Sequence, residues 1–154
     1  MHDSKVISIC IGRVAGAKME EVTEVIAEKN KGLVGDRYYS GNGSFNKSNP
    51  GKRQITFMNA MFFEDSGFNF SDSRRNIFTE GVELMDLIGK EFSVGEAGFR
   101  GVKYCDPCNR PNTLTSIKRS FREAFFDRGG LVAEIIESGI IRTGDKVRVP
   151  KKDY

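Results

Sequence analysis

The segment 91–108, EFSVGEAGFRGVKYCDPC, carries the clearest fold signal in this 154-residue chain. Apolar residues alternate with polar ones in Glu91–Val94 and recur through Ala97–Tyr104, which is the pattern of half-buried strands. Gly95 and Glu96 between them fit the two-residue connection of a β-hairpin. The segment therefore predicts two paired antiparallel strands. It ends in a Cys-x-x-Cys pair at positions 105 and 108.

Short apolar segments on both sides of this hairpin predict further strands. They are residues 6–11, 21–28, 53–58, 131–136 and 146–149. We expect a short helix from Asn59, a turn or short helix over residues 82–88, and a longer helix over about residues 113–127, where apolar residues share one helical stripe. Because regular helices do not separate the strands, a parallel α/β sheet is not expected. The prediction is a single, mainly β domain over residues 1–154. Its strands would form a closed or nearly closed β-barrel with two or three helical insertions.

The overall charge is mildly basic, at +3 with a pI near 8.8. This is far from the charge of a dedicated nucleic-acid binder, so we expect no nucleic-acid partner. A small anionic ligand fits better, because a local pair such as Arg74-Arg75 can act without a large global field. No apolar run is long enough to span a membrane, and the first residues lack a signal-peptide pattern. With three cysteines, an odd count, we expect a reduced cytoplasmic protein.

Cys105 and Cys108 allow several interpretations. They could be small buried hydrophobic residues at a strand end, since free cysteine is often buried. A structural zinc site needs four ligands, and beyond this pair the chain offers only Cys10 and His2, so zinc is disfavoured. A thioredoxin-like site fits neither the β pattern nor Pro111. A thiolate that binds a metal or carries sulfur is the remaining interpretation.

Two basic motifs could bind an anion. In Arg74-Arg75-Asn76, guanidinium groups could grip a phosphate and the amide could bind a heterocycle edge. The alternative is a solvated surface turn. In Asp36-Arg37 the two side chains could form a structural salt bridge or face a ligand. The sequence leaves both choices open.

The motifs, taken in order, resemble the MOSC domain, which is named after the C-terminal part of molybdenum cofactor sulfurases. The matching motifs are GLVGDR at 32–37, RQIT at 53–56, RRNIFT at 74–79, DLIGKEF at 86–92, VGE at 94–96 and CDPC at 105–108. The resemblance implies a β-barrel-like domain that binds molybdenum cofactor or handles sulfur for it. Many stand-alone members carry a His soon after Gly-Asp-Arg, where this chain has Tyr38-Tyr39, so no role of that imidazole is carried over.

The resemblance also implies roles for particular residues. Cys108 would be the metal ligand or persulfide carrier and the catalytic group, with Cys105 as a second candidate metal ligand. Arg74 and Asn76 lie on the segment that resembles the family's cofactor contact. The other cofactor-binding candidates are Arg75, Arg37 and Asp36.

Two reactions share this implied site. One is delivery of sulfur from a cysteine desulfurase. The other is oxo transfer, such as reduction of an N-hydroxylated compound with electrons from an electron-transfer partner. The competing hypothesis is a non-catalytic binding module with buried cysteines and a basic docking helix. We favour an enzyme that takes an anionic pterin cofactor, and a homodimer stays open.

Overall fold

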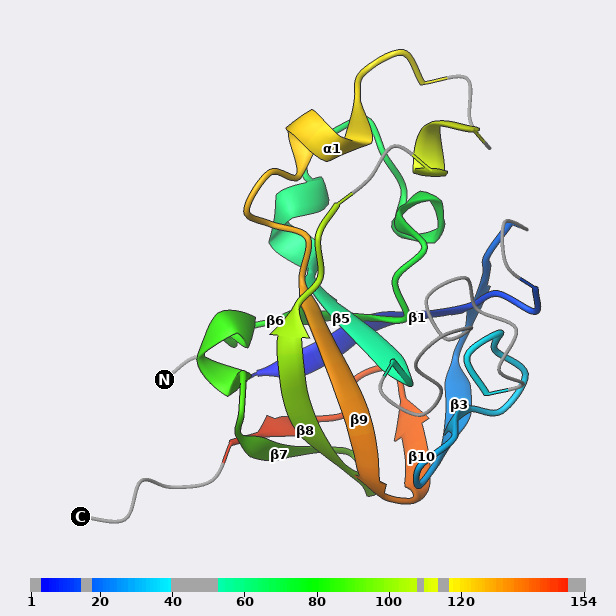
Figure 1. Cartoon of the computed structure of the whole chain (residues 1–154), viewed down its shortest axis with the longest axis vertical. Helices are drawn as coiled ribbons and strands as arrows, with labels where there is room; N and C mark the ends of the chain where they lie inside the picture. Colours follow the sequence, from blue (N-terminus) through cyan, green and yellow to red (C-terminus); the bar gives the residue numbers. More distant parts are fainter. Residues whose placement is uncertain (1–3, 15–17, 40–52, 108–109, 114–116, 150–154) are drawn as a thin grey trace.

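The computed structural model describes residues 4–14, 18–39, 53–107, 110–113 and 117–149. Within these ranges the chain forms eleven strands, one α-helix and four 3-10 turns, so the mainly β prediction is confirmed. Figure 1 shows the strands gathered in one body, with α1 and neighbouring 3-10 turns at one end of it.

The elements follow one another in a fixed order along the chain. The strands are β1 (Lys5–Ile11), β2 (Glu20–Val22), β3 (Glu24–Glu28), β4 (Gly32–Leu33), β5 (Ile55–Asn59), β6 (Ile77–Glu80), β7 (Glu91–Val94), β8 (Ala97–Tyr104), β9 (Leu131–Glu137), β10 (Gly139–Arg142) and β11 (Val147–Arg148). The helical elements are η2 (Ala60–Phe63), η3 (Phe70–Ser73), η4 (Leu84–Leu87), η5 (Arg110–Thr113) and α1 (Phe121–Ala124).

The strands form two sheets that enclose the main hydrophobic core. The larger sheet has the order β11-β7-β8-β9-β5-β6-β1-β2, and the smaller has the order β10-β3-β4. Apolar residues of the small sheet, such as Val25, Leu33 and Ile141, belong to the same buried cluster as Phe57 and Phe99 of the large sheet. Burial of this apolar surface is the main force that holds the two sheets together.

The large sheet does not close into a barrel among the described residues, because β11 and β2 remain its edges. An isolated antiparallel bridge joins Lys5 to Lys146, and the Val6 amide donates to the Asp145 carbonyl at 2.8 Å. The two ends of the sheet therefore approach each other without forming a continuous ladder. The predicted closed barrel is not confirmed.

A second buried cluster lies at the end that carries the helical elements. It is rich in aromatic residues and comprises Cys10, Met19, Met58, Phe63, Phe68, Phe78, Phe121 and Phe125. The Phe121 and Phe125 rings stack with centroids 4.5 Å apart. Phe63 and Phe68 each contact the Phe125 ring, so η2 and α1 share this core. The cluster connects the helical end to β1, β5 and β6.

The long helix predicted over residues 113–127 is wrong in length. Residues 114–116 lie outside the described ranges, and α1 covers only Phe121–Ala124. The Asn112 amide donates to the carbonyls of Ile117 and Arg119 and accepts from the Phe121 amide. An Asn side chain that takes these backbone groups competes with helical hydrogen bonds. Ser120 then caps the short helix.

The hairpin prediction is confirmed without change, since β7 and β8 have the expected bounds and pair in antiparallel register. Sequence reasoning missed β4, β6 and β10. The first three residues of β6 are all buried, so its sequence lacks the alternation that marks a half-buried strand. The Gly-, Asn- and Pro-containing residues 38–50 predict a long loop, and most of that segment falls outside the described ranges. No described helix is long and apolar enough to cross a membrane.

Candidate functional site

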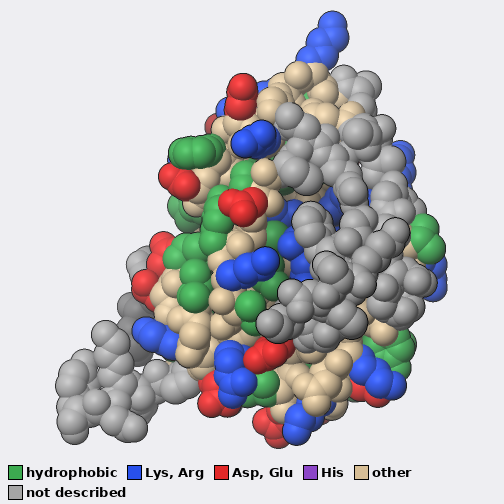
Figure 2. Space-filling model, viewed as in Figure 1, with side chains coloured by type: hydrophobic (Ala, Val, Ile, Leu, Met, Phe, Trp, Pro, Cys, Tyr) green, Lys and Arg blue, Asp and Glu red, His purple; other side chains and the backbone are tan. Residues whose placement is uncertain are grey.

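Four arginines belong to a network of buried and half-buried side chains, and two of them, Arg53 and Arg75, contact the segment that contains Cys105 and Asp106. We call Arg37, Arg53, Arg74 and Arg75 the arginine cluster. Three of them, at positions 37, 74 and 75, are buried, at 4–5% exposed. Figure 2 shows Lys and Arg side chains spread over one face of the molecule among acidic and hydrophobic ones. Burying a guanidinium group costs free energy unless charges or hydrogen bonds compensate it, so each buried arginine is expected to have such partners.

Asp36 and Asn76 form the floor of this cluster. The Asp36 carboxylate accepts from the Gly12 amide at 2.9 Å and forms a salt bridge with Arg37 at 3.1 Å. The Asn76 amide nitrogen donates to Asp36 at 3.3 Å and to the Cys10 carbonyl at 3.1 Å. The Asn76 oxygen accepts from Thr56. Asn76 is fully buried, and its amide is engaged by protein groups, so its evident role is to position Asp36 and neighbouring strands.

Tyr38 links two members of the arginine cluster. Its phenolic oxygen accepts hydrogen bonds from Arg37 and from Arg53, each at 3.1 Å. The Arg37 guanidinium also lies 4.3 Å from the centre of the Tyr38 ring, which is a cation–π contact. Arg37 donates in addition to the Arg74 carbonyl at 2.9 Å. Tyr38 therefore holds two cationic side chains close together.

Arg53 connects this network to the cysteine segment. Its guanidinium donates to the Cys105 sulfur at 3.1 Å. Burial opposes the charged form of Arg53, but the Cys105 sulfur and the Tyr38 oxygen favour it, and the pKa of this guanidinium is raised. Cys105 is 1% exposed. Its sulfur is thus buried and accepts a hydrogen bond from a cationic side chain.

Arg75 ties three segments of the chain together. Its guanidinium donates to the carbonyls of Gly129 at 2.8 Å, Ser73 at 3.2 Å and Asp106 at 3.1 Å. The Cys105 amide also donates to the Gly130 carbonyl at 2.8 Å. The segment that leads into Pro107 is therefore held at two consecutive residues.

The structure brings most of the sequence-predicted site residues together. Asp36, Arg37 and Asn76 share direct contacts, and Arg74 joins them through its carbonyl. Arg75 contacts the cysteine segment through the Asp106 carbonyl. Cys108, the predicted catalytic residue and metal ligand, lies outside the described residues. Within the described part of the chain, no three His, Cys, Asp or Glu side chains form a group that could hold a metal.

Two members of the site were not predicted as site residues. Arg53 was noted as part of a predicted strand and of the motif RQIT, and Tyr38 as the start of a predicted loop and as the replacement of a histidine. Their contact through one phenolic oxygen is a tertiary feature, because fifteen residues separate them in the chain. The adjacency of Tyr38 to Asp36-Arg37 was the one available signal.

Cys10 stands apart from this site chemically. It is fully buried in the aromatic cluster. Burial raises the pKa of its thiol to about 12, with a further contribution from the Glu21 carboxylate. A thiol with that pKa stays protonated at neutral pH and is a weak nucleophile. Cys10 is therefore a core residue.

The comparisons with known proteins agree with this fold. The family model of the MOSC domain matches residues 52–148. The YuaD protein of Bacillus subtilis has a similar crystal structure, with a TM-score of 0.78, 16% identity, and coverage of 99% of this chain and 98% of that one.

YiiM from Geobacillus stearothermophilus matches with a TM-score of 0.66 and 13% identity, covering 96% of this chain and 75% of that one. YiiM from Escherichia coli matches with a TM-score of 0.64 and 16% identity, covering 99% and 72%. These identities establish likeness of fold alone. A search of curated proteins found no match. The family model covers well over half of the sequence, and the chain belongs to the MOSC domain family.

Proposed function

We propose that this protein binds the anionic molybdenum cofactor and uses a cysteine thiolate as metal ligand or persulfide carrier. The MOSC domain is associated with molybdenum cofactor binding, which supplies the family-level support. The observation that carries the proposal is the arginine cluster, hydrogen-bonded to the cysteine segment through Arg53 and Arg75. A phosphate-bearing pterin is a ligand that guanidinium forks suit.

The residues of this site fit a phosphate-bearing cofactor, and we assign them two different roles. Asp36, Asn76 and Arg75 direct their polar atoms to protein partners, so we assign them to positioning. Arg53 is the one member of the arginine cluster that is half-buried rather than buried, so we assign it to anion binding. Molybdenum, once bound, would supply oxo-transfer chemistry.

We also assign different roles to the two cysteines of the CDPC motif. Cys105 is buried and accepts a hydrogen bond from Arg53, so we assign it to anchoring the segment. Cys108, three residues later, is the group we assign to ligation or sulfur transfer. In the sulfur reaction its thiolate attacks the outer sulfur of a donor persulfide, forms the new S–S bond and releases the donor thiolate.

Metal and cofactor analysis tests the proposal. The full chain is produced in a cofactor-competent host, purified anaerobically, and analysed for molybdenum, oxidised pterin and cyanide-releasable sulfur. We expect the wild-type protein to contain molybdenum with pterin, or cyanide-releasable sulfur. Whichever of these is found should be lost in Cys108→Ser. Arg53→Ala should lower the cofactor content, whereas Arg100→Ala, an exposed arginine paired with Glu134, should not. Neither molybdenum nor releasable sulfur in the wild type would contradict the proposal.

The burial of Cys105 favours one competing function, a binding module without chemistry at the cysteines. Thiol labelling separates the two hypotheses. In folded protein freed of cofactor and of cyanide-releasable sulfur, a catalytic or carrier site requires that Cys108 react rapidly with iodoacetamide while Cys105 reacts slowly. Slow labelling of both cysteines would favour the module.

A further inference from the structure

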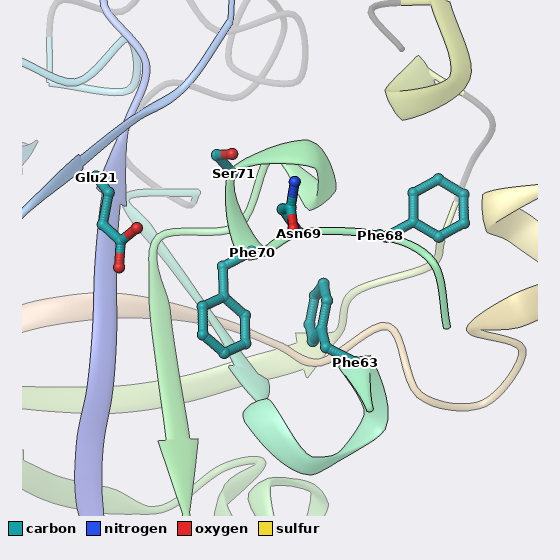
Figure 3. A pocket seen from close by; sticks show the side chains of 6 residues that line it. All are labelled: Glu21, Phe63, Phe68, Asn69, Phe70 and Ser71. Atoms are coloured by element: carbon teal, nitrogen blue, oxygen red, sulfur yellow. The ribbon is translucent and has the colours of Figure 1, made fainter. Parts of the chain in front are cut away.

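A pocket of about 440 Å³ differs in its lining from the arginine cluster. Its lining residues are Glu21, Phe63, Phe68, Asn69, Phe70 and Ser71. Figure 3 shows the Glu21 carboxylate across from the Phe70 ring, with Phe63 next to Phe70 and with Asn69 and Ser71 on the same side as η3. None of these residues belongs to the arginine cluster, and the one charged side chain among them is a carboxylate.

The aromatic wall of this pocket is preorganised. Phe63 and Phe70 pack edge to face with centroids 5.0 Å apart, and Phe70 stacks on Phe78 at 4.6 Å. Phe68 packs edge to face against Phe121 at 5.1 Å. Because each ring is held by another ring, a ligand that contacts them pays little to order the wall.

The polar groups of the pocket are also held in place. Ser8, 2% exposed, donates its hydroxyl to Glu21 at 2.5 Å. The Asn69 side chain accepts from the Asp72 amide in the capping box of η3. Glu21 presents an exposed carboxylate, oriented by the Ser8 hydrogen bond, beside aromatic rings.

We propose that this pocket binds a planar aromatic cation, such as an aryl amidinium or a protonated heteroaromatic amine. Aromatic rings attract cations through the quadrupole of the ring, and a carboxylate forms charge-assisted hydrogen bonds with N–H donors. The volume lies within the range of small-molecule sites, roughly 300–1,000 Å³. The site is independent of molybdenum and of Cys108, so it does not rest on the proposed function.

Benzamidinium, compared with the neutral and nearly isosteric benzamide, tests the proposal by NMR titration of backbone amides. We expect benzamidinium to shift the amides of Glu21 and Ser71 with a Kd on the order of 1 mM, typical of a fragment of this size. Benzamide should bind at least about fivefold more weakly, because it lacks the charge that the carboxylate recognises.

Matched variants locate the site. Glu21→Gln keeps the side-chain shape and should reduce benzamidinium binding to the level of benzamide. Glu20→Gln removes a neighbouring carboxylate that does not line the pocket, and should leave binding unchanged. Phe70→Leu should weaken both ligands, and thermal unfolding of each variant checks that it is folded. Equal binding of the two ligands, unchanged binding in Glu21→Gln, or no shift of pocket amides at about ten times the expected Kd would overturn the proposal.

Discussion

Replacing Asn76 by Ala tests the buried network beneath the arginine cluster. The amide oxygen accepts from the Thr56 backbone N–H at 3.0 Å, and the amide nitrogen donates to the Cys10 carbonyl at 3.1 Å. Both groups are fully buried and would lose these partners. Asp36 would lose one hydrogen bond but would keep those from Gly12 and Arg37.

The expected cost follows from these contacts. A buried polar group that loses its partner costs about 1–3 kcal/mol, and two such groups together cost about 4 kcal/mol. The free energy of unfolding of a domain is typically about 5–15 kcal/mol, so a large share would be lost. For a chain of this length, each kcal/mol lowers Tm by about 2–4 °C, which predicts a fall of roughly 10 °C.

Urea unfolding monitored by circular dichroism, together with thermal scans, measures the loss in protein without cofactor. Asn69→Ala is the matched control, because this exposed Asn caps η3 and its loss should cost only about 1 kcal/mol. If Asn76→Ala lost no more stability than Asn69→Ala, the amide would not be a structural link. The reasoning that assigns Asn76 to positioning would then be refuted.

Three further predictions concern other parts of the fold. In Arg75→Lys, one ammonium group cannot reach the three carbonyls that the guanidinium binds, so hydrogen exchange of the Cys105 amide should accelerate at least about tenfold. Unchanged protection of that amide would show that Arg75 does not hold the segment. Burial raises the pKa of the Cys10 thiol to about 12 from its ordinary value of 9.0, so the thiol ionises first in the unfolded chain, and the free energy of unfolding should fall between pH 9 and 12. Urea midpoints should show a steeper fall in the wild type than in Cys10→Val, and equal slopes would count against a buried thiol. Gly130→Ala should cost several kcal/mol, about 3 or more, because φ is +102° and the new Cβ would collide with a β5 carbonyl. Gly144→Ala, at φ +92° but in open space, should cost only about 1 kcal/mol, and equal Tm losses would refute the steric argument.

Local patterns in the sequence were sufficient for several strands and for the family. The alternation in residues 91–104 predicted β7 and β8 with their bounds, because a strand with one buried face repeats every two residues. The order of weak motifs predicted the MOSC domain, and the family model confirms it. The stripe predicted a longer helix than α1, because the Asn112 side chain takes backbone groups that a helix would use.

The sequence by itself determined the mainly β class, the hairpin and the family, because these depend on residues close together in the chain or on the order of motifs. Only the tertiary structure decided which arginines meet. Arg53 joins Cys105 across 52 residues, and Arg75 joins Gly129 across 54. It also placed Asn76 and Arg75 in hydrogen bonds to protein groups, since buried polar atoms need partners. Hydrogen-bond partners at such separations are set by how the sheets pack, and no local pattern records them.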